Sequence, residues 1–130
     1  SRETGEGRFL SELPGVSYHV MGVGFTWETQ DRERDAEAAR SGWDEAKRLL
    51  GKGGPDLILL DELNIVIKNG LLRVDEVLEA IAERPAMQHV VVTGRGAPPA
   101  LIEAADTVTE MGSVKHAFGA GVKAQKGVEW

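Results

Sequence analysis

The sequence has 130 residues, the length of one domain, and 42% of them are apolar, which is enough for a hydrophobic core. Its 15 Lys and Arg stand against 21 Asp and Glu, and a net charge of −6 argues against non-specific nucleic-acid binding. The absence of cysteine excludes disulfides and thiolate chemistry. No apolar run reaches the roughly 20 residues that span a bilayer, and no signal-peptide core is present, so we expect a cytoplasmic protein that acts away from membranes.

Strands and helices are predicted to alternate along the first half of the chain. Residues 16–21 follow a Pro-Gly turn signal and predict a first strand. Residues 31–50 predict a helix, because their apolar side chains recur on one helical face. Leu57–Leu60 is a continuous apolar run, which is typical of parallel strands whose two faces are both covered by helices.

The same alternation continues in the second half. Residues 74–83 predict a helix, residues 89–93 a second buried strand, and residues 97–105 a short helix with proline near its start. Residues 106–111 predict a third strand, and the glycine-rich residues 112–130 an ordered loop or lid. This order indicates an α/β fold with a parallel sheet, in which ligands bind beyond the carboxyl ends of the strands.

An acidic pair follows the first of the buried strands. Asp61 and Glu62 after four apolar residues form a Walker B pattern, in which carboxylates face a magnesium ion bound to nucleotide phosphates. An acid that caps the next helix would explain the same residues, so both interpretations stay open. The companion phosphate loop, G-x-x-x-x-G-K-[S/T], does not occur in the sequence, and residues 51–54 suit the end of a helix better.

Aromatic and histidine residues provide further candidates. Phe25 and Trp27 lie two positions apart in a glycine-flanked loop, and an extended backbone would point both rings the same way. They either cover a large planar ligand or anchor the loop in the core. No histidines have the i, i+4 spacing of a helical zinc site. His116, in the glycine-rich tail, is the histidine we select as a site candidate, whereas His19 and His89 are interpreted as structural.

Four blocks of sequence, in an order and spacing that fit the whole chain, match one known family. They are GFTWETQ (residues 24–30), LLDELN (59–64), TGRGA (93–97) and the long, specific block KHAFGAGVKAQKGVEW (115–130). On these blocks the chain resembles the P-loop-type ATP:corrinoid adenosyltransferases, the cob(I)alamin adenosyltransferases of bacterial cobalamin synthesis and salvage.

The resemblance implies a fold, an assembly and an activity. It implies a RecA-like P-loop α/β fold with a mainly parallel sheet flanked by helices, one adenosyltransferase domain over residues 1–130, and a homodimer. It also implies transfer of the 5′-deoxyadenosyl group of ATP to the cobalt(I) of a corrinoid, cobalamin or cobinamide, with release of triphosphate and a flavin-dependent reductant for the cobalt. The family's N-terminal strands and phosphate loop are absent from this sequence, so we expect little activity from residues 1–130 alone.

Roles for individual residues follow from the resemblance. It implies that Glu62, with Asp61 beside it, holds magnesium on the ATP phosphates, that Phe25 and Trp27 face the corrinoid, and that Arg95 lies on the phosphate side. No catalytic nucleophile is expected, because cobalt(I) is itself the nucleophile. Two other readings stay open: another P-loop-fold ATPase or kinase, and a non-catalytic corrinoid- or nucleotide-binding module.

Overall fold

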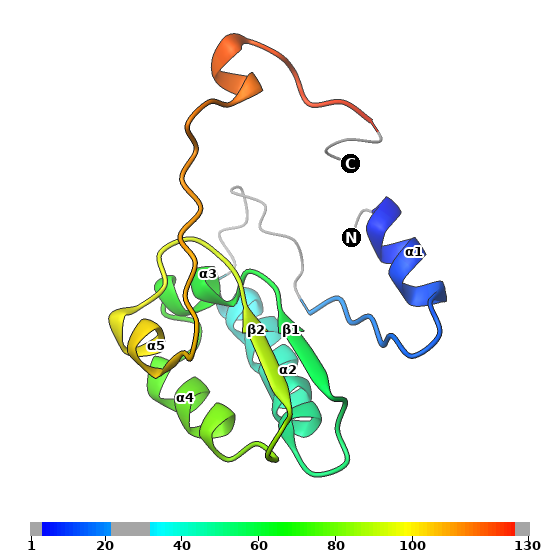
Figure 1. The fold of residues 1–130 in the computed structure, drawn as a ribbon, viewed down its shortest axis with the longest axis vertical. Helices are drawn as coiled ribbons and strands as arrows, with labels where there is room; N and C mark the ends of the chain where they lie inside the picture. Colours follow the sequence, from blue (N-terminus) through cyan, green and yellow to red (C-terminus); the bar gives the residue numbers. More distant parts are fainter. Residues whose placement is uncertain (1–3, 22–31, 127–130) are drawn as a thin grey trace. The chain divides into compact units, whose positions relative to one another are not determined.

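A computed structural model describes residues 4–21 and 32–126 (Figure 1). In chain order its elements are α1 (Gly5–Glu12), α2 (Arg32–Leu50), β1 (Leu57–Leu60), α3 (Leu63–Lys68), α4 (Val74–Ala82), β2 (His89–Val92), α5 (Pro99–Ala104) and the 3₁₀ helix η1 (Ala117–Ala120). They belong to two compact units. One comprises residues 21–108 and contains the sheet, and the other comprises residues 1–20 and 109–130.

The sheet consists of β1 and β2, which run parallel and are joined by a crossover through α3 and α4. Leu57 pairs with His89, and Leu60 pairs with Val92. The two strands therefore end at the same edge, and the segments that follow them leave it side by side (Figure 1). The α/β class that the sequence predicts is confirmed by this strand–helix–strand unit.

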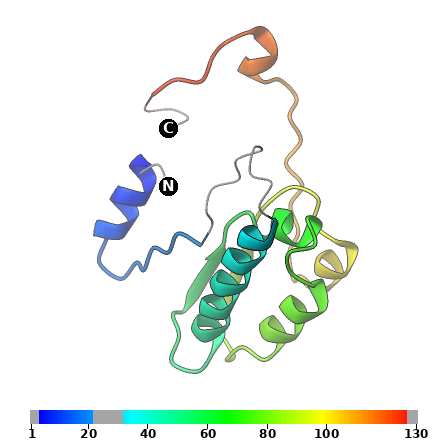
Figure 2. The same cartoon turned by 180° about the vertical axis from the view of Figure 1, so that it is seen from behind.

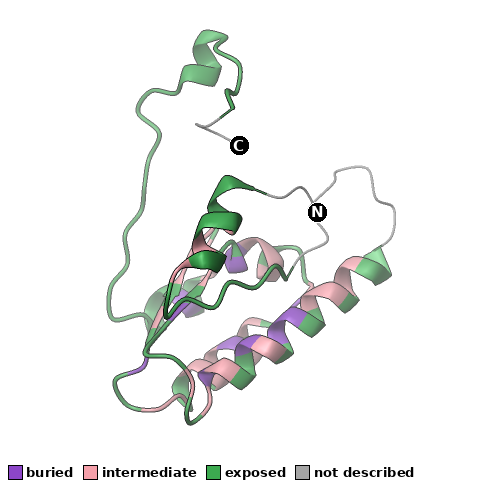
Figure 3. Cartoon of the chain, turned by 90° about the vertical axis from the view of Figure 1, so that its right-hand side faces the viewer, coloured by how far each residue is buried: buried purple, intermediate pink, exposed green. Residues whose placement is uncertain are grey.

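The core lies on one face of the sheet. Helix α2 runs along this face (Figure 2) and contributes the buried side chains Trp43, Ala46 and Leu50. Ile58 of β1 and Val77 of α4 complete the cluster, and Val77 is fully buried. In Figure 3 the buried residues form a stripe along α2, as the 3-and-4 spacing of its apolar residues predicts.

The opposite face of the sheet is uncovered in the part of the chain that the structure describes. Leu57 and Leu59 are each 59% exposed, and Val91 is 44% exposed. The expectation that helices cover both faces was therefore wrong for these residues. The opposite face stays exposed because α2 and α4 both pack on the face that carries Ile58.

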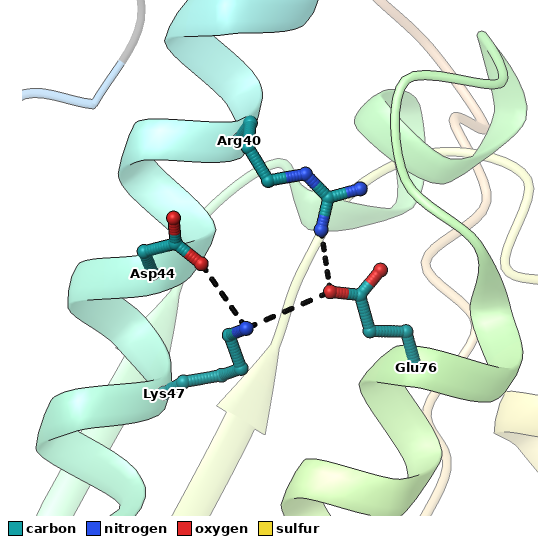
Figure 4. A network of polar contacts seen from close by, with 4 residues as sticks. All are labelled: Arg40, Asp44, Lys47 and Glu76. Atoms are coloured by element: carbon teal, nitrogen blue, oxygen red, sulfur yellow. Dashed lines mark hydrogen bonds and ion pairs between the residues drawn. The ribbon is translucent and has the colours of Figure 1, made fainter.

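Charged residues also join α2 to α4 (Figure 4). Arg40 and Lys47 of α2 both pair with Oε1 of Glu76 in α4, at 2.5 and 3.8 Å, and Lys47 pairs with Asp44 at 3.1 Å. All four side chains are at least a quarter exposed. Each pair is therefore expected to contribute at most about 1 kcal/mol.

Two predicted strands are not formed. Residues 16–21 and 106–111 have no regular secondary structure, and neither segment pairs with β1 or β2. An isolated apolar segment does not become a strand unless a neighbour satisfies its backbone N–H and C=O groups. Val20 and Met111, 64% and 93% exposed, show that these segments also lack a covering layer among the described residues.

The helices agree better with the sequence. The predicted helices 31–50, 74–83 and 97–105 correspond to α2, α4 and α5, whereas α1 and α3 were not predicted. The predicted loop at 112–130 contains only η1 within its described part. In the part of the chain that the structure describes, no helix has the length and apolar character needed to span a bilayer.

Candidate functional site

The segments that follow β1 and β2 bring the predicted acidic pair and the TGRG sequence to one edge of the sheet. Asp61 and Glu62 follow β1, and Thr93, Gly94 and Arg95 follow β2. The two segments come together because the strands are parallel and in register. This edge is the candidate site, and the sequence predicted both of its segments.

The Thr93 hydroxyl ties the two segments together. It donates to Oδ1 of Asp61 at 2.6 Å and accepts from the backbone N–H of Glu62 at 3.0 Å. The single hydroxyl thus donates its hydrogen to the carboxylate and accepts the backbone N–H with a lone pair. The Asp61 carboxylate is held in one orientation, and no described residue donates a hydrogen bond to its second oxygen.

Glu62 adopts a backbone conformation that is unfavourable for its residue type. Its φ of 57° and ψ of 18° are left-handed, which costs a residue with a Cβ about 1–2 kcal/mol. It occupies the position before α3, yet its side chain makes no capping hydrogen bond. Glu62 is therefore the N-cap residue of α3 by position, but its carboxylate does not cap the helix. Backbone strain of this kind is common at functional sites, and the sequence pattern does not predict it.

Gly94 is the point of close approach between the β2 loop and α3. Its φ is 122°, and a Cβ there would lie 3.0 Å from the Cβ of Asn64 and 3.3 Å from the Cα of Glu62. Asn64 is buried, its backbone N–H donates to the Thr93 carbonyl at 3.3 Å, and its Nδ2 donates to the Gly94 carbonyl at 2.9 Å. Sequence reasoning missed the role of Asn64, whose one visible signal was its place at the end of the LLDELN block.

Two cations lie along the same loop. Arg95 is exposed between Gly94 and Gly96, and Gly96 also has a positive φ, of 74°. The Lys68 side chain at the end of α3 runs beside Gly96, with its Cδ 3.4 Å from where a Gly96 Cβ would stand. Neither Arg95 nor Lys68 forms an ion pair with a residue that the structure describes. Both side chains are therefore available to an anionic ligand.

The donor set fits a magnesium ion that is shared with phosphates. Among the described residues there is no group of three or more His, Cys, Asp or Glu side chains that would hold a metal. Magnesium commonly takes only one or two carboxylates and completes its shell with phosphate oxygens and water. Asp61 and Glu62, both exposed at the edge of the sheet, meet that requirement.

The remaining predicted site residues are Phe25, Trp27 and His116. Phe25 and Trp27 lie outside the described residues. His116 belongs to the unit of residues 1–20 and 109–130, where it precedes η1 and its Nδ1 accepts a hydrogen bond from the Phe118 N–H at 3.1 Å. Its role in binding stays a prediction.

Comparison with known proteins identifies the family. Residues 1–130 match the family model described as ATP:corrinoid adenosyltransferase BtuR/CobO/CobP. The chain belongs to this family. It is 63% identical over 128 residues to a corrinoid adenosyltransferase of Pseudomonas aeruginosa, an alignment that covers 98% of this chain and 63% of that protein.

More distant adenosyltransferases of the family match the same portion. The chain is 49% identical over 123 residues to the corrinoid adenosyltransferase of Escherichia coli K12, and 46% identical over 123 residues to corrinoid adenosyltransferase CobA of Salmonella typhimurium. Each alignment covers 95% of this chain and 63% of the relative. The chain therefore spans a little under two thirds of the length of these relatives.

Proposed function

We propose that the full-length protein transfers the 5′-deoxyadenosyl group of ATP to the cobalt(I) of a corrinoid and releases triphosphate. The observation that carries the proposal is the family match over residues 1–130. Cobalt(I) is the nucleophile: its electron pair forms the bond to C5′, the C5′–O bond breaks, and triphosphate leaves with the electrons of that bond. The protein then needs no nucleophilic side chain, and its contribution is position and charge.

The edge where β1 and β2 end is assigned to the phosphate side of ATP. Asp61 and Glu62 hold the magnesium that accompanies the phosphates, and the hydrogen bond from Thr93 keeps the Asp61 carboxylate in orientation. Arg95 neutralises the charge that grows on the departing triphosphate. When bound, magnesium neutralises phosphate charge. The exposure of both acids and of Arg95 at one edge supports these assignments.

Phe25 and Trp27 are assigned to the corrinoid side, and His116 stays a candidate ligand-binding residue. The sequence supports this assignment, because two aromatic rings next to glycines suit a large planar ring system. Packed on the corrinoid they would exclude water and weaken an axial ligand of cobalt. Loss of that ligand makes the one-electron reduction of cobalt(II) to cobalt(I) easier, and a flavin-dependent reductant is the proposed source of the electron.

The proposal extends to fold, assembly and location. We infer a RecA-like P-loop fold that forms one adenosyltransferase domain across residues 1–130, a homodimer, and a cytoplasmic enzyme. The parallel sheet and the acidic pair at its carboxyl edge support the fold.

A spectroscopic assay tests the function. The full-length protein is mixed with magnesium, ATP and a chemically reduced corrinoid, and the loss of the cobalt(I) absorbance is followed together with triphosphate release. The proposal expects both signals in equal amounts and neither without ATP. Phosphate or ADP formation without alkylation of cobalt would instead indicate another P-loop-fold ATPase or kinase.

A second candidate is a non-catalytic corrinoid- or nucleotide-binding module. Binding of corrinoid or ATP by the full-length protein, without any loss of cobalt(I), would identify this function.

A further inference from the structure

Asn64 is the buried side chain that joins the two halves of the candidate site. It is 5% exposed, and three contacts connect it to the β2 loop. Its backbone N–H donates to the Thr93 carbonyl, its Nδ2 donates to the Gly94 carbonyl, and its Cβ lies against Gly94 so closely that a methyl group there would meet it at 3.0 Å. All three contacts are with the backbone of the β2 loop, and none of them involves a ligand.

The contacts of Asn64 continue into the charged residues on either side. Glu62 lies two positions before it and bonds Thr93 through the backbone, and Asp61 accepts from the Thr93 hydroxyl. Arg95 follows Gly94 directly. Any movement of Gly94 away from Asn64 would therefore displace the neighbouring Arg95 and disturb the Thr93 hydrogen bonds to both acids.

From this geometry we infer that Asn64 is a positioning residue, which sets the distance between the Arg95 loop and the acidic pair Asp61–Glu62. It acts through the Thr93–Gly94 backbone and does not itself touch substrate. The effect of Asn64 on magnesium and ATP binding rests on the proposed function, whereas its effect on the position of the loop does not. A disturbed Asn64 should therefore weaken magnesium-dependent nucleotide binding before it weakens the fold.

Gln88 provides a matched control at the opposite end of the same strands. It is a buried amide too, 6% exposed, and its Nε2 donates to the carbonyls of Leu49 and Pro55 at 3.1 and 2.8 Å. Within the described residues, neither its Oε1 nor the Oδ1 of Asn64 has a hydrogen-bond partner. Gln88→Ala thus removes a comparable amide from the edge of the sheet that carries no candidate site residue.

The first experiment measures amide hydrogen exchange in the ligand-free full-length protein. Two variants are compared with wild type: Asn64→Ala, and the isosteric Asn64→Asp, which lacks the Nδ2 donor. In both, the exchange rates of the Glu62 and Thr93 amides should rise about tenfold, which corresponds to the loss of one hydrogen bond. In Gln88→Ala exchange should rise at His89, whose N–H donates to Asp56, and stay unchanged at Glu62 and Thr93. Equal exchange at Glu62 and Thr93 in wild type and both Asn64 variants would overturn the inference.

The second experiment titrates magnesium into the protein with ATP and measures the magnesium concentration at half-maximal ATP binding, below the melting temperature of every variant. Asn64→Ala should raise this concentration about tenfold, for the loss of one positioning hydrogen bond, and Gln88→Ala should not change it. A normal value in an Asn64→Ala protein with raised exchange would overturn the inference. Failure of the wild-type protein to bind ATP with magnesium would instead overturn the proposed function, and the exchange experiment would still decide the role of Asn64.

Discussion

Glu62 combines a costly backbone with an exposed carboxylate. Its left-handed conformation is held by the hydrogen bond from its N–H to the Thr93 hydroxyl and by the start of α3 immediately after it. A glycine would adopt the same backbone without penalty. Because the position nevertheless carries an acid, we take the side chain and not the backbone to be what the site requires.

The carboxylate of Glu62 is expected to serve magnesium. Glu62→Gln keeps the shape of the side chain and removes a charged oxygen ligand, so the mutant should require more magnesium and turn over more slowly. Its melting temperature should match wild type, since the Glu62 side chain makes no capping bond. Turnover and magnesium dependence equal to those of wild type would rule out Glu62 as a ligand.

The strained backbone at Glu62 leads to a separate prediction about the free energy of unfolding. Glu62→Gly should unfold with a free energy about 1 kcal/mol higher than Glu62→Ala, because alanine keeps the left-handed penalty and glycine does not. Met87, with a φ of 69° at the other end of β2, is the control. Met87→Gly should show the same advantage over Met87→Ala, but only the Glu62 pair should lose magnesium–ATP binding. An alanine variant as stable as the glycine variant would argue against strain.

Phe25 and Trp27 are expected to act on the reduction of cobalt more than on ATP. A Phe25→Ala, Trp27→Ala enzyme should fail with a cobalt(II) corrinoid and an enzymatic reductant, and recover in part when cobalt(I) is made chemically beforehand. Its affinity for ATP should hardly change, because neither residue belongs to the acidic edge. Equal losses with both oxidation states, in a mutant of unchanged melting temperature, would contradict a role in reduction.

Whether a site residue could be predicted from the sequence depends on how far its role relies on tertiary structure. Asp61 and Glu62 were predictable, because an acid after a buried apolar run is a local pattern. Thr93 and Asn64 were not, because their roles arise from hydrogen bonds to partners about 30 positions away in the chain. The left-handed backbone of Glu62 has no sequence signal, since a residue with a Cβ is the least expected choice there.

At the level of elements, α4 presents an ion pair and a core residue side by side. Glu76 pairs with Arg40 at the surface, whereas its neighbour Val77 is fully buried. Glu76→Gln should lower the free energy of unfolding by less than about 1 kcal/mol, and by less still at high salt. Val77→Ala should lower it by about 1.5–3 kcal/mol through lost burial and a residual cavity. Chemical denaturation of both variants tests the order, and a larger loss for Glu76→Gln would contradict it.

Elements were predictable where their signal was periodic and failed where they needed a partner. The 3-and-4 spacing of α2 specified both the helix and its buried face. Residues 16–21 have suitable composition for a strand but no neighbour in the described chain with which to pair. The short helix α3 escaped prediction because its six residues are too few to show a helical period.

At the scale of the whole chain, residues 1–130 contain no phosphate-loop sequence of their own. Residues 1–130 prepared alone should show little or no adenosyl transfer, because no segment of them supplies the backbone N–H groups and lysine of a phosphate loop. The exposed Leu57, Leu59 and Val91 should also promote self-association of this preparation, visible in sedimentation. Full activity from a monomeric preparation with a mass of 14.0 kDa would contradict both arguments.

The hydrogen bonds that join Thr93 and Gly94 to residues 60–64 span 29 to 33 positions of the chain, so the acidic edge exists only after β1 and β2 have paired across their crossover. An unfolded chain has no such edge and cannot compete for its ligand. Occupancy and folding are then thermodynamically linked: a ligand present at 100 times its dissociation constant adds about 2.7 kcal/mol to the stability of this unit. Ligand supply in the cell would in this way govern how long the protein survives proteolysis as well as how fast it works.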